Sequence, residues 1–223
     1  MKKIAIFDLD GTILNTIEDL SDAGNEICRR HGFPLHSIDE YRFFVGNGIP
    51  KLVHRFVPEG TDSETEAECL KEFIEFYKDH SALKTRPYEG LTEVLKKLKD
   101  EQFLLAVNTN KVENAAVDLC AEYFPQIFDI VIGNKEGLPV KPAPDGVYEI
   151  LNKVGISLQD ARNGAAVYIG DSDVDIQTGV NAGIAAIGVD WGFRGEDFLK
   201  AHGADIVAKN PEDLLRSIKN VVL

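Results

Sequence analysis

The chain of 223 residues allows one large domain, or one core with a smaller insert. Its composition, 44% hydrophobic and 27% charged, is that of a globular protein with an ordinary core. Because there are 37 acidic side chains and only 24 basic ones, the formal net charge is −13, which argues against nucleic acid or an anionic membrane as the main partner.

The cysteines and the apolar runs bear on the cellular compartment. The three cysteines, Cys28, Cys69 and Cys120, are far apart, which predicts reduced thiols that serve packing. No apolar run approaches the roughly 20 residues of a membrane span. Asp8 and Asp10 interrupt the segment after the two N-terminal lysines, which disfavours a signal peptide. We expect a cytoplasmic protein without membrane contact, either a monomer or a weak homodimer.

The first predicted element is a buried strand over residues 3–8, rich in β-branched and aromatic side chains. Asp8 and Asp10 lie at its end, and side chains two apart along a strand point the same way. Gly11 and Thr12 follow in a loop whose backbone could approach a ligand closely. The alternative is an acidic turn without function, since Asp and Gly are common turn residues.

Residues 15–82 carry only helical patterns. Asn15 and Glu18 resemble a capping box at the start of the first helix, and Ser37 can cap the second. Gly46-Asn47-Gly48 interrupts the pattern before the third helix. The predicted helices span residues 15–31, 38–44, 49–57 and 64–80.

From Thr85 onward, strands alternate with helices, and the first of these helices is predicted over residues 91–101. This alternation predicts a mainly parallel sheet covered by helices. The strand at residues 3–8 finds no partner before residue 103, so we expect an α/β core of residues 1–14 and 83–223 with a helical insert over 15–82. The predicted later strands span residues 103–108, 128–132, 166–170, 184–189 and 205–208.

Polar residues follow several of these strands, at the edge where ligands bind in open α/β sheets. Thr109 and Asn110 are expected to open a helix, whose free amides attract anions; the alternative is that they only cap it. Lys141 lies in a loop stiffened by Pro142 and Pro144, which limits where its ammonium group can go. The alternative for Lys141 is an ordinary solvated lysine.

The last strand end of this kind carries Asp171 and Asp175, four residues apart and expected on one helix face, with Asp173 assigned to capping. An ordinary acidic helix start is the alternative. Together with Asp8 and Asp10 these carboxylates would repel one another, by about 4 kcal/mol per pair at 4 Å and an effective dielectric constant near 20. One lysine cannot compensate, so we expect a hard divalent cation, for which Mg²⁺ fits best, in a site suited to phosphate.

Four short motifs, each after a predicted strand, resemble in order those of the haloacid dehalogenase (HAD) superfamily. The resemblance implies a Rossmann-like core and makes the helical insert, residues 15–82, a cap domain. It covers nearly the whole chain outside that insert. The motifs are Asp8-Leu9-Asp10-Gly11-Thr12, Thr109-Asn110, Lys141-Pro142 and Gly170-Asp171-Ser172-x-x-Asp175.

The resemblance also implies roles for these residues. Asp8 would attack phosphorus to give an aspartyl-phosphate, and Asp10 would exchange protons with the leaving alcohol and then with water. Mg²⁺ would bind Asp8, the backbone carbonyl of Asp10 and Asp171, while Asp175 would hold this arrangement without binding the ion itself. The phosphoryl group would be bound by Gly11, Thr109, Asn110 and Lys141.

Within the insert, residues 41–48 are similar to the cap loop of phosphoglycolate phosphatases, and Trp191-Gly192-Phe193-Arg194 is reminiscent of the same branch. This implies that Arg42 and Asn47 face the leaving group, although Gly46 and Gly48 could equally form a simple helix-breaking turn. The expected partner is a small phosphorylated metabolite such as 2-phosphoglycolate.

Several alternative functions stay open at this stage. A phosphosugar mutase or a pyrophosphatase of the same superfamily would keep all four motifs. A haloacid dehalogenase proper needs no second aspartate, so Asp10 disfavours it. A receiver-like signalling domain also combines aspartates, Mg²⁺, Thr and Lys-Pro, but it is about half this length and lacks a helical insert.

Overall fold

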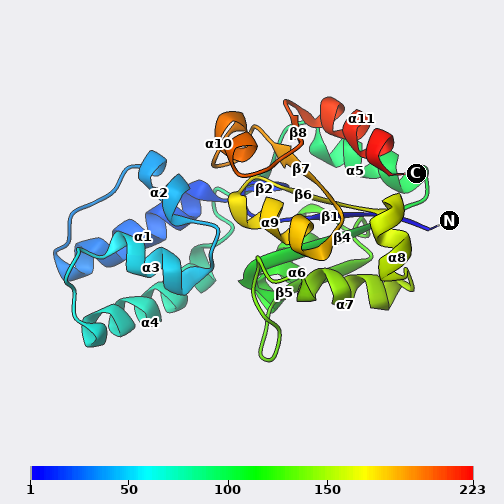
Figure 1. The fold of residues 1–223 in the computed structure, drawn as a ribbon. Helices are drawn as coiled ribbons and strands as arrows, with labels where there is room; N and C mark the ends of the chain where they lie inside the picture. The colour runs from blue at the N-terminus through cyan, green and yellow to red at the C-terminus, as the bar shows by residue number, and fades with distance from the viewer. Residues whose placement is uncertain (1, 223) are drawn as a thin grey trace. The chain divides into compact units, whose positions relative to one another are not determined.

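A computed structural model describes residues 2–222, and these residues form two compact units (Figure 1). One unit comprises residues up to Leu14 together with Pro87 onward, and the other spans Asn15–Arg86. The chain thus returns to the larger unit at Pro87, four residues later than the residue 83 that the sequence pattern predicts. The reason is that the amides of Lys84 and Thr85 donate to the carboxylate of Asp19, at distances of 2.8–3.1 Å, and so belong to the helical unit.

The larger unit is built on a six-stranded sheet in the order β5-β4-β1-β6-β7-β8, in which every neighbouring pair is parallel. This confirms the predicted mainly parallel sheet flanked by helices. In the central strand β1, residues 4–7 are fully buried, as their continuous apolar run requires, and only Lys3 at its start is partly exposed. The strands are β1 (Lys3–Phe7), β4 (Phe103–Val112), β5 (Ile130–Asn134), β6 (Ala166–Gly170), β7 (Ala185–Val189) and β8 (Ile206–Ala208).

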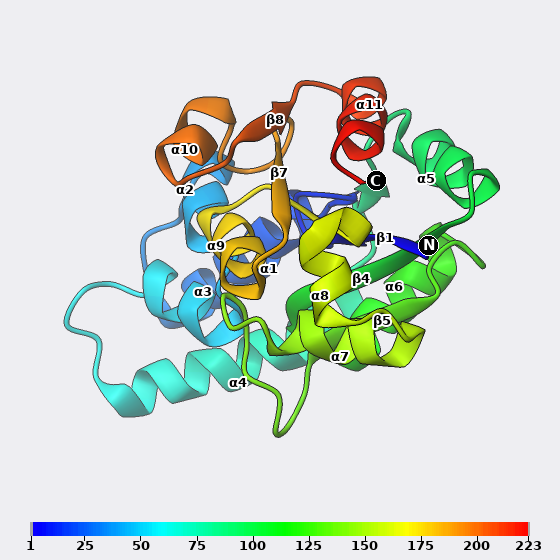
Figure 2. The ribbon, with the colours of Figure 1, turned by 45° about the vertical axis from the view of Figure 1, so that its right-hand side comes forward.

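Helices cover both faces of this sheet, with α5 and α11 on one face and α7 and α9 on the other (Figures 1 and 2). On the second face, side chains of α7 pack with Ile4, Ile6 and Tyr168 of the sheet in one apolar cluster. The helices of this unit are α5 (Leu91–Asp100), α6 (Glu113–Tyr123), α7 (Asp145–Val154), α8 (Leu158–Asp160), α9 (Asp173–Ala182), α10 (Glu196–Ala201) and α11 (Pro211–Val221), and a π-helical turn spans Ala161–Ala165.

The smaller unit is a set of four helices, as the pattern in residues 15–82 predicts. Their shared core combines aliphatic side chains with aromatic rings that contact one another. Gly24 of the first helix lets the Tyr41 side chain approach so closely that a Cβ at Gly24 would collide with it. The predicted box between Asn15 and Glu18 is wrong, because α1 begins at Ile17 and Asn15 lies in a short strand. The helices are α1 (Ile17–His31), α2 (Ile38–Phe44), α3 (Ile49–Phe56) and α4 (Ser63–His80).

Where the chain passes between the units, the short strands β2 (Leu14–Asn15) and β3 (Arg86–Pro87) pair with each other. Among the described residues, no helix combines the length and the apolar character that a membrane span needs. The three cysteines are buried and unbridged, in keeping with their predicted packing role.

Candidate active site

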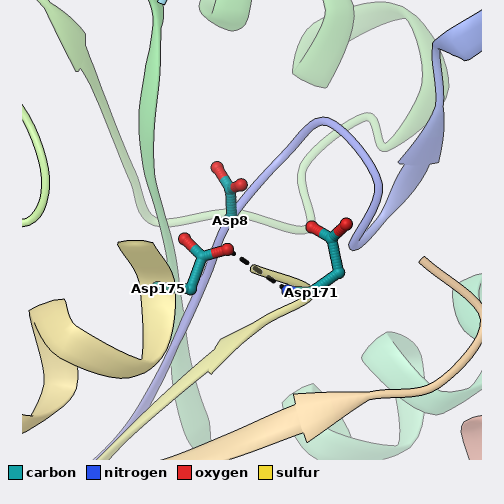
Figure 3. A group of neighbouring side chains, drawn as sticks. All are labelled: Asp8, Asp171 and Asp175. Carbon is teal, nitrogen blue, oxygen red and sulfur yellow. Dashed lines mark hydrogen bonds between the residues drawn. The ribbon is translucent and has the colours of Figure 1, made fainter. Parts of the chain in front are cut away.

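The carboxyl ends of β1 and β6 mark the place where the order of strand connections reverses. From β1 the chain goes on to β4 and β5, whereas from β6 it goes on to β7 and β8 on the other side. Such a reversal leaves a crevice at the carboxyl ends of the two strands, where ligands bind. Asp8 directly follows β1 and Asp171 directly follows β6, so the topology alone brings these two residues side by side (Figure 3).

Asp8, Asp171 and Asp175 form a buried cluster in which each carboxylate has an oxygen within 4.8 Å of the others (Figure 3). Burial, and next the charge of Asp175, raise the pKa of Asp8 to about 7. The same two causes raise the pKa of Asp171 to about 8. The fold therefore holds carboxylates together at a cost that a bound cation would offset.

Lys141 lies among these carboxylates and is itself buried. Its Nζ is 2.8 Å from Asp8 Oδ1 and 2.6 Å from Asp175 Oδ1. Burial by itself would lower the pKa of Lys141, but Asp175 and Asp8 outweigh it and hold that pKa well above its usual value. Lys141 is thus a fixed positive charge beside the predicted nucleophile, not a solvated surface lysine.

Asp175 is held as much by hydrogen bonds as by charge. Its Oδ2 accepts from the amides of Asp171 and Ser172 and from the Ser172 hydroxyl at 2.6 Å. Ser172 and Asp175 together form the capping box of α9, so the capping role predicted for Asp173 is wrong. With one oxygen engaged in this way and the other on Lys141, Asp175 orients its neighbours.

The other neighbours of Asp171 come from two loops. Its Oδ1 accepts from the Thr12 hydroxyl at 3.1 Å, and its Oδ2 accepts from the Phe193 amide at 2.7 Å. A Cβ at Gly11 or at Gly192 would collide with this aspartate, and Gly11 also has a positive φ of 87°. The Gly11 amide donates to the Leu14 carbonyl, and the lack of a side chain at Gly11 leaves space for Asp171.

Thr109 and Asn110 differ from their prediction, because they do not open a helix. Strand β4 continues past them through a bulge to Val112, which pairs with Asn134, and α6 begins only at Glu113. The Asn110 side chain accepts from the Lys141 amide at 2.8 Å and donates to the Lys141 carbonyl at 3.3 Å. Asn110 thus fixes the backbone of Lys141.

Thr109 is buried at the same strand end. Its hydroxyl oxygen accepts from the Lys111 amide at 3.2 Å, so the hydroxyl hydrogen is what it can offer to an anion.

Asp10 has a different environment from Asp8. Its side chain is partly exposed, and both of its carboxylate oxygens lie near Lys111 Nζ, at 3.1 and 3.4 Å. Sequence reasoning missed Lys111, because a lysine expected in the first turn of a helix would point to solvent. The only signal was its position directly after Thr109-Asn110. The expectation of a single lysine among the four aspartates is therefore wrong.

The charges at this strand edge allow a test of the expected metal. The charged side chains there are Asp8, Asp10, Asp171, Asp175, Lys111 and Lys141. Four carboxylates and two ammonium groups leave two negative charges, which one divalent cation would balance. The three buried carboxylates offer only oxygen, the donor that Mg²⁺ prefers. The residues present therefore fit a Mg²⁺ ion.

The predicted cap-loop residues lie in the helical unit. Arg42 is on α2, with its side chain exposed and 3.6 Å from Asp39. Asn47 Oδ1 accepts from Arg55 at 2.8 Å, and Arg55 also donates to the Phe44 carbonyl at 2.7 Å.

Gly46 and Gly48 have positive φ values of 120° and 84°, which fits the turn that sequence reasoning left open as an alternative.

Replacing Lys141 by methionine should destabilise the protein strongly, since it leaves Asp8 and Asp175 buried without their shared ammonium group. In Mg²⁺-free buffer at pH 8 we expect the free energy of unfolding to fall by about 3–5 kcal/mol, as when one partner of a buried ion pair is removed. Urea unfolding measures it. The matched control Lys135→Met removes a more exposed lysine that pairs with Glu149 and should cost at most about 1 kcal/mol. Equal losses would contradict the buried role of Lys141.

Comparison with known proteins gives one family and several full-length relatives. The sequence pattern of the family described as haloacid dehalogenase-like hydrolase matches residues 5–189. The chain is similar to a phosphoglycolate phosphatase of Vibrio vulnificus (31% identity, covering 99% of this chain and 96% of the relative) and to pyrophosphatase PpaX of Halalkalibacterium halodurans (29%, covering 94% of each). A crystal structure from Lactobacillus delbrueckii subsp. bulgaricus, described as a candidate phosphoglycolate phosphatase, has a TM-score of 0.91 at 34% identity, covering 98% of this chain and 99% of that one.

Proposed function

Because this chain belongs to the haloacid dehalogenase-like hydrolase family, we propose that it is a Mg²⁺-dependent phosphatase acting on a small phosphate monoester through an aspartyl-phosphate. The first candidate substrate is a small phosphorylated acid such as 2-phosphoglycolate, because relatives that match over nearly their full length carry the name phosphoglycolate phosphatase.

The observation that carries this proposal is the contrast between the two aspartates of the first loop. Asp8 is buried beside Lys141 and within the carboxylate cluster, whereas Asp10 is partly exposed beside Lys111. Two carboxyl groups in such different surroundings suit two different tasks. A nucleophile has to be held rigidly beside a positive charge, and a proton carrier has to reach the leaving oxygen.

The proposed reaction has two transfers. In the first, an Asp8 oxygen bonds to phosphorus, the ester P–O bond breaks, and Asp10 gives its proton to the leaving oxygen. In the second, Asp10 takes a proton from water, the water oxygen bonds to phosphorus, and the bond to Asp8 breaks. Inorganic phosphate leaves and both aspartates return to their starting state.

The remaining residues act on charge. Lys141 and the Thr109 hydroxyl would donate to phosphoryl oxygens, and Asn110 would keep Lys141 in place through its backbone. Asp8, Asp171 and the Asp10 carbonyl would hold Mg²⁺, which when bound supplies positive charge near the phosphoryl group. Uncatalysed hydrolysis of phosphate monoesters can need roughly 28 kcal/mol of barrier reduction, so these contributions have to combine.

The proposal is tested by assaying purified protein with Mg²⁺ on a panel of substrates and scoring phosphate release as kcat/KM. The panel contains 2-phosphoglycolate, a hexose phosphate, a nucleoside monophosphate and inorganic pyrophosphate. We expect 2-phosphoglycolate to have the highest value. Preference for pyrophosphate, which the similarity to PpaX makes the second candidate, would replace the monoester proposal. Isomerisation of the hexose phosphate without phosphate release would indicate a mutase.

We further propose that Asn47 in the cap loop contacts the part of the substrate that leaves. Asn47→Ala should then lower kcat/KM for the preferred substrate by roughly tenfold, as loss of one hydrogen bond to a charged group does. An aryl phosphate that lacks the preferred leaving group should be hydrolysed almost as before. Unchanged kcat/KM for every good substrate would exclude this role for Asn47.

A further inference from the structure

Lys111 is one of the most deeply buried ion-pair partners in the described part of the chain. Its side chain is 5% exposed and that of Asp10 is 15% exposed, and the two pairs that Lys141 makes with Asp8 and Asp175 are less accessible still. Surface pairs contribute little to stability, and a buried pair costs desolvation that hydrophobic side chains would avoid. A lysine in this position therefore calls for an explanation beyond stability.

The backbone that carries Lys111 is irregular. The pairing of β4 with β5 shifts between Asn108 and Val112, and Lys111 lies inside this bulge. Bulges redirect a side chain away from the direction that regular alternation would give it, and they are common beside active sites. Here the bulge places the Lys111 ammonium against Asp10, which comes from the loop after the neighbouring strand β1.

The two lysines of the site do not duplicate each other. Lys141 contacts Asp8 and Asp175 and faces the position where a phosphoryl group would be bound to Asp8. Lys111 contacts both oxygens of Asp10, so it restrains the orientation of that carboxyl group. An aspartate that transfers a proton must present one oxygen to the leaving group within hydrogen-bond distance. Without a restraint, a partly exposed carboxyl group would lose that orientation by rotation.

We propose that Lys111 is a positioning residue for the leaving-group step: it holds the carboxyl group of Asp10 where its proton reaches the leaving oxygen. This inference rests on the proposed phosphatase function and adds to it a residue outside the four motifs. In the step concerned, the bond from Asp8 to phosphorus forms, the ester P–O bond breaks, and the proton passes from Asp10 to the leaving oxygen. Lys111 makes no contact with the phosphoryl group in this step.

The test compares substrates that differ in their need for a proton. An alkyl phosphate such as 2-phosphoglycolate has a strongly basic leaving oxygen, whereas 2,4-dinitrophenolate leaves without protonation. The measured quantity is kcat/KM, which reports the first phosphoryl transfer and is insensitive to the second. The variants are Lys111→Met and the conservative Lys111→Arg. The control is Lys135→Met, which removes a lysine that pairs with Glu113 and Glu149 outside the site.

We expect Lys111→Met to lower kcat/KM for the alkyl phosphate by about 10²-fold, the lower end of the range for general acid catalysis. The loss for dinitrophenyl phosphate should be much smaller, and the inhibition constant of inorganic phosphate should stay unchanged. Lys111→Arg should recover most of the alkyl phosphate activity, and Lys135→Met should match the wild type. Equal losses on both substrates, or weaker binding of inorganic phosphate, would overturn the proposal.

A double-mutant cycle separates positioning from folding. In an Asp10→Asn background, Lys111→Met should cause no further loss in the first transfer, because the group that it positions is already gone. An additive loss would mean that Lys111 acts independently of Asp10 and would contradict the proposal. If Lys111→Met does not fold, Lys111→Gln takes its place in both comparisons. Absence of Mg²⁺-dependent hydrolysis by the wild type would instead reject the phosphatase function itself.

Discussion

Asp8→Asn is expected to lower kcat/KM by on the order of 10⁴ to 10⁶-fold, the range seen when the nucleophile of a covalent mechanism is removed. The amide is nearly the same size as the carboxylate, but it cannot form the bond to phosphorus. It also withdraws one negative charge from the cluster with Asp171 and Asp175. Phosphate release under saturating Mg²⁺ measures the loss, and near-normal turnover would reject Asp8 as the nucleophile.

The loss of activity should not be accompanied by a loss of stability. Burial raises the pKa of Asp8 to about 7, so the fold disfavours its charged form, and a neutral side chain removes this penalty. In Mg²⁺-free buffer at pH 8 the Tm of Asp8→Asn should equal or exceed that of the wild type. Asp129→Asn is the matched control: it makes the same chemical change at a residue that pairs with Lys99 and accepts from the Leu105 amide, outside the site. It should keep near-normal turnover.

The parts of the site that sequence reasoning predicted are those that depend on strand ends. Apolar runs set the positions of β1 and β6, and the topology of a parallel sheet brings their carboxyl ends together, so Asp8 and Asp171 could be paired without a structure. The helical insert was equally visible, because residues 15–82 repeat apolar positions at helical spacing. Both inferences use regular periodicity, which is a property of the sequence itself.

The parts that could not be predicted depend on irregular backbone and on contacts between distant segments. Asn110 was expected to bind phosphate at a helix start, but the bulge in β4 turns it onto the backbone of Lys141. The same bulge brings Lys111 to Asp10. The amide of Phe193 donates to Asp171 across a separation of 22 residues. No local pattern carries this information, because it arises only when loops after different strands are packed against one another.

Removal of Mg²⁺ by a chelator is expected to abolish turnover, and the stability that Mg²⁺ adds should depend strongly on pH. The pKa of Asp8 is raised from 3.8 to about 7 and that of Asp171 from 3.8 to about 8, first by burial and next by the charge of Asp175. The fold thus favours the protonated forms. The stability that protonation of Asp8 and Asp171 adds to the metal-free protein is fully present below pH 3.8 and is lost as the pH rises through 7 and 8.

Mg²⁺ binds the deprotonated carboxylates, so at pH 5 it has to displace protons that the fold holds, whereas at pH 8 it meets largely ionised groups. At a Mg²⁺ concentration one hundred times its Kd at pH 8, binding contributes about 2.7 kcal/mol, or roughly 5–10 °C in Tm for a chain of this size. At pH 5 the same concentration should raise the Tm far less. Thermal melts with Mg²⁺ or with EDTA across this pH range measure the difference.

Asp8→Asn again supplies the matched variant, because it removes one of the two titrating ligands and leaves Asp171 in place. Its metal-free Tm should fall less steeply between pH 5 and pH 8 than that of the wild type, and Mg²⁺ should raise its Tm less at pH 8. A Mg²⁺ effect of the same size at both pH values would contradict the assignment of Asp8 and Asp171 as ligands. The same two protons govern the stability of the metal-free fold and the entry of the ion. If one cluster is responsible for both, the metal-free Tm and the gain in Tm from Mg²⁺ must change over the same pH range.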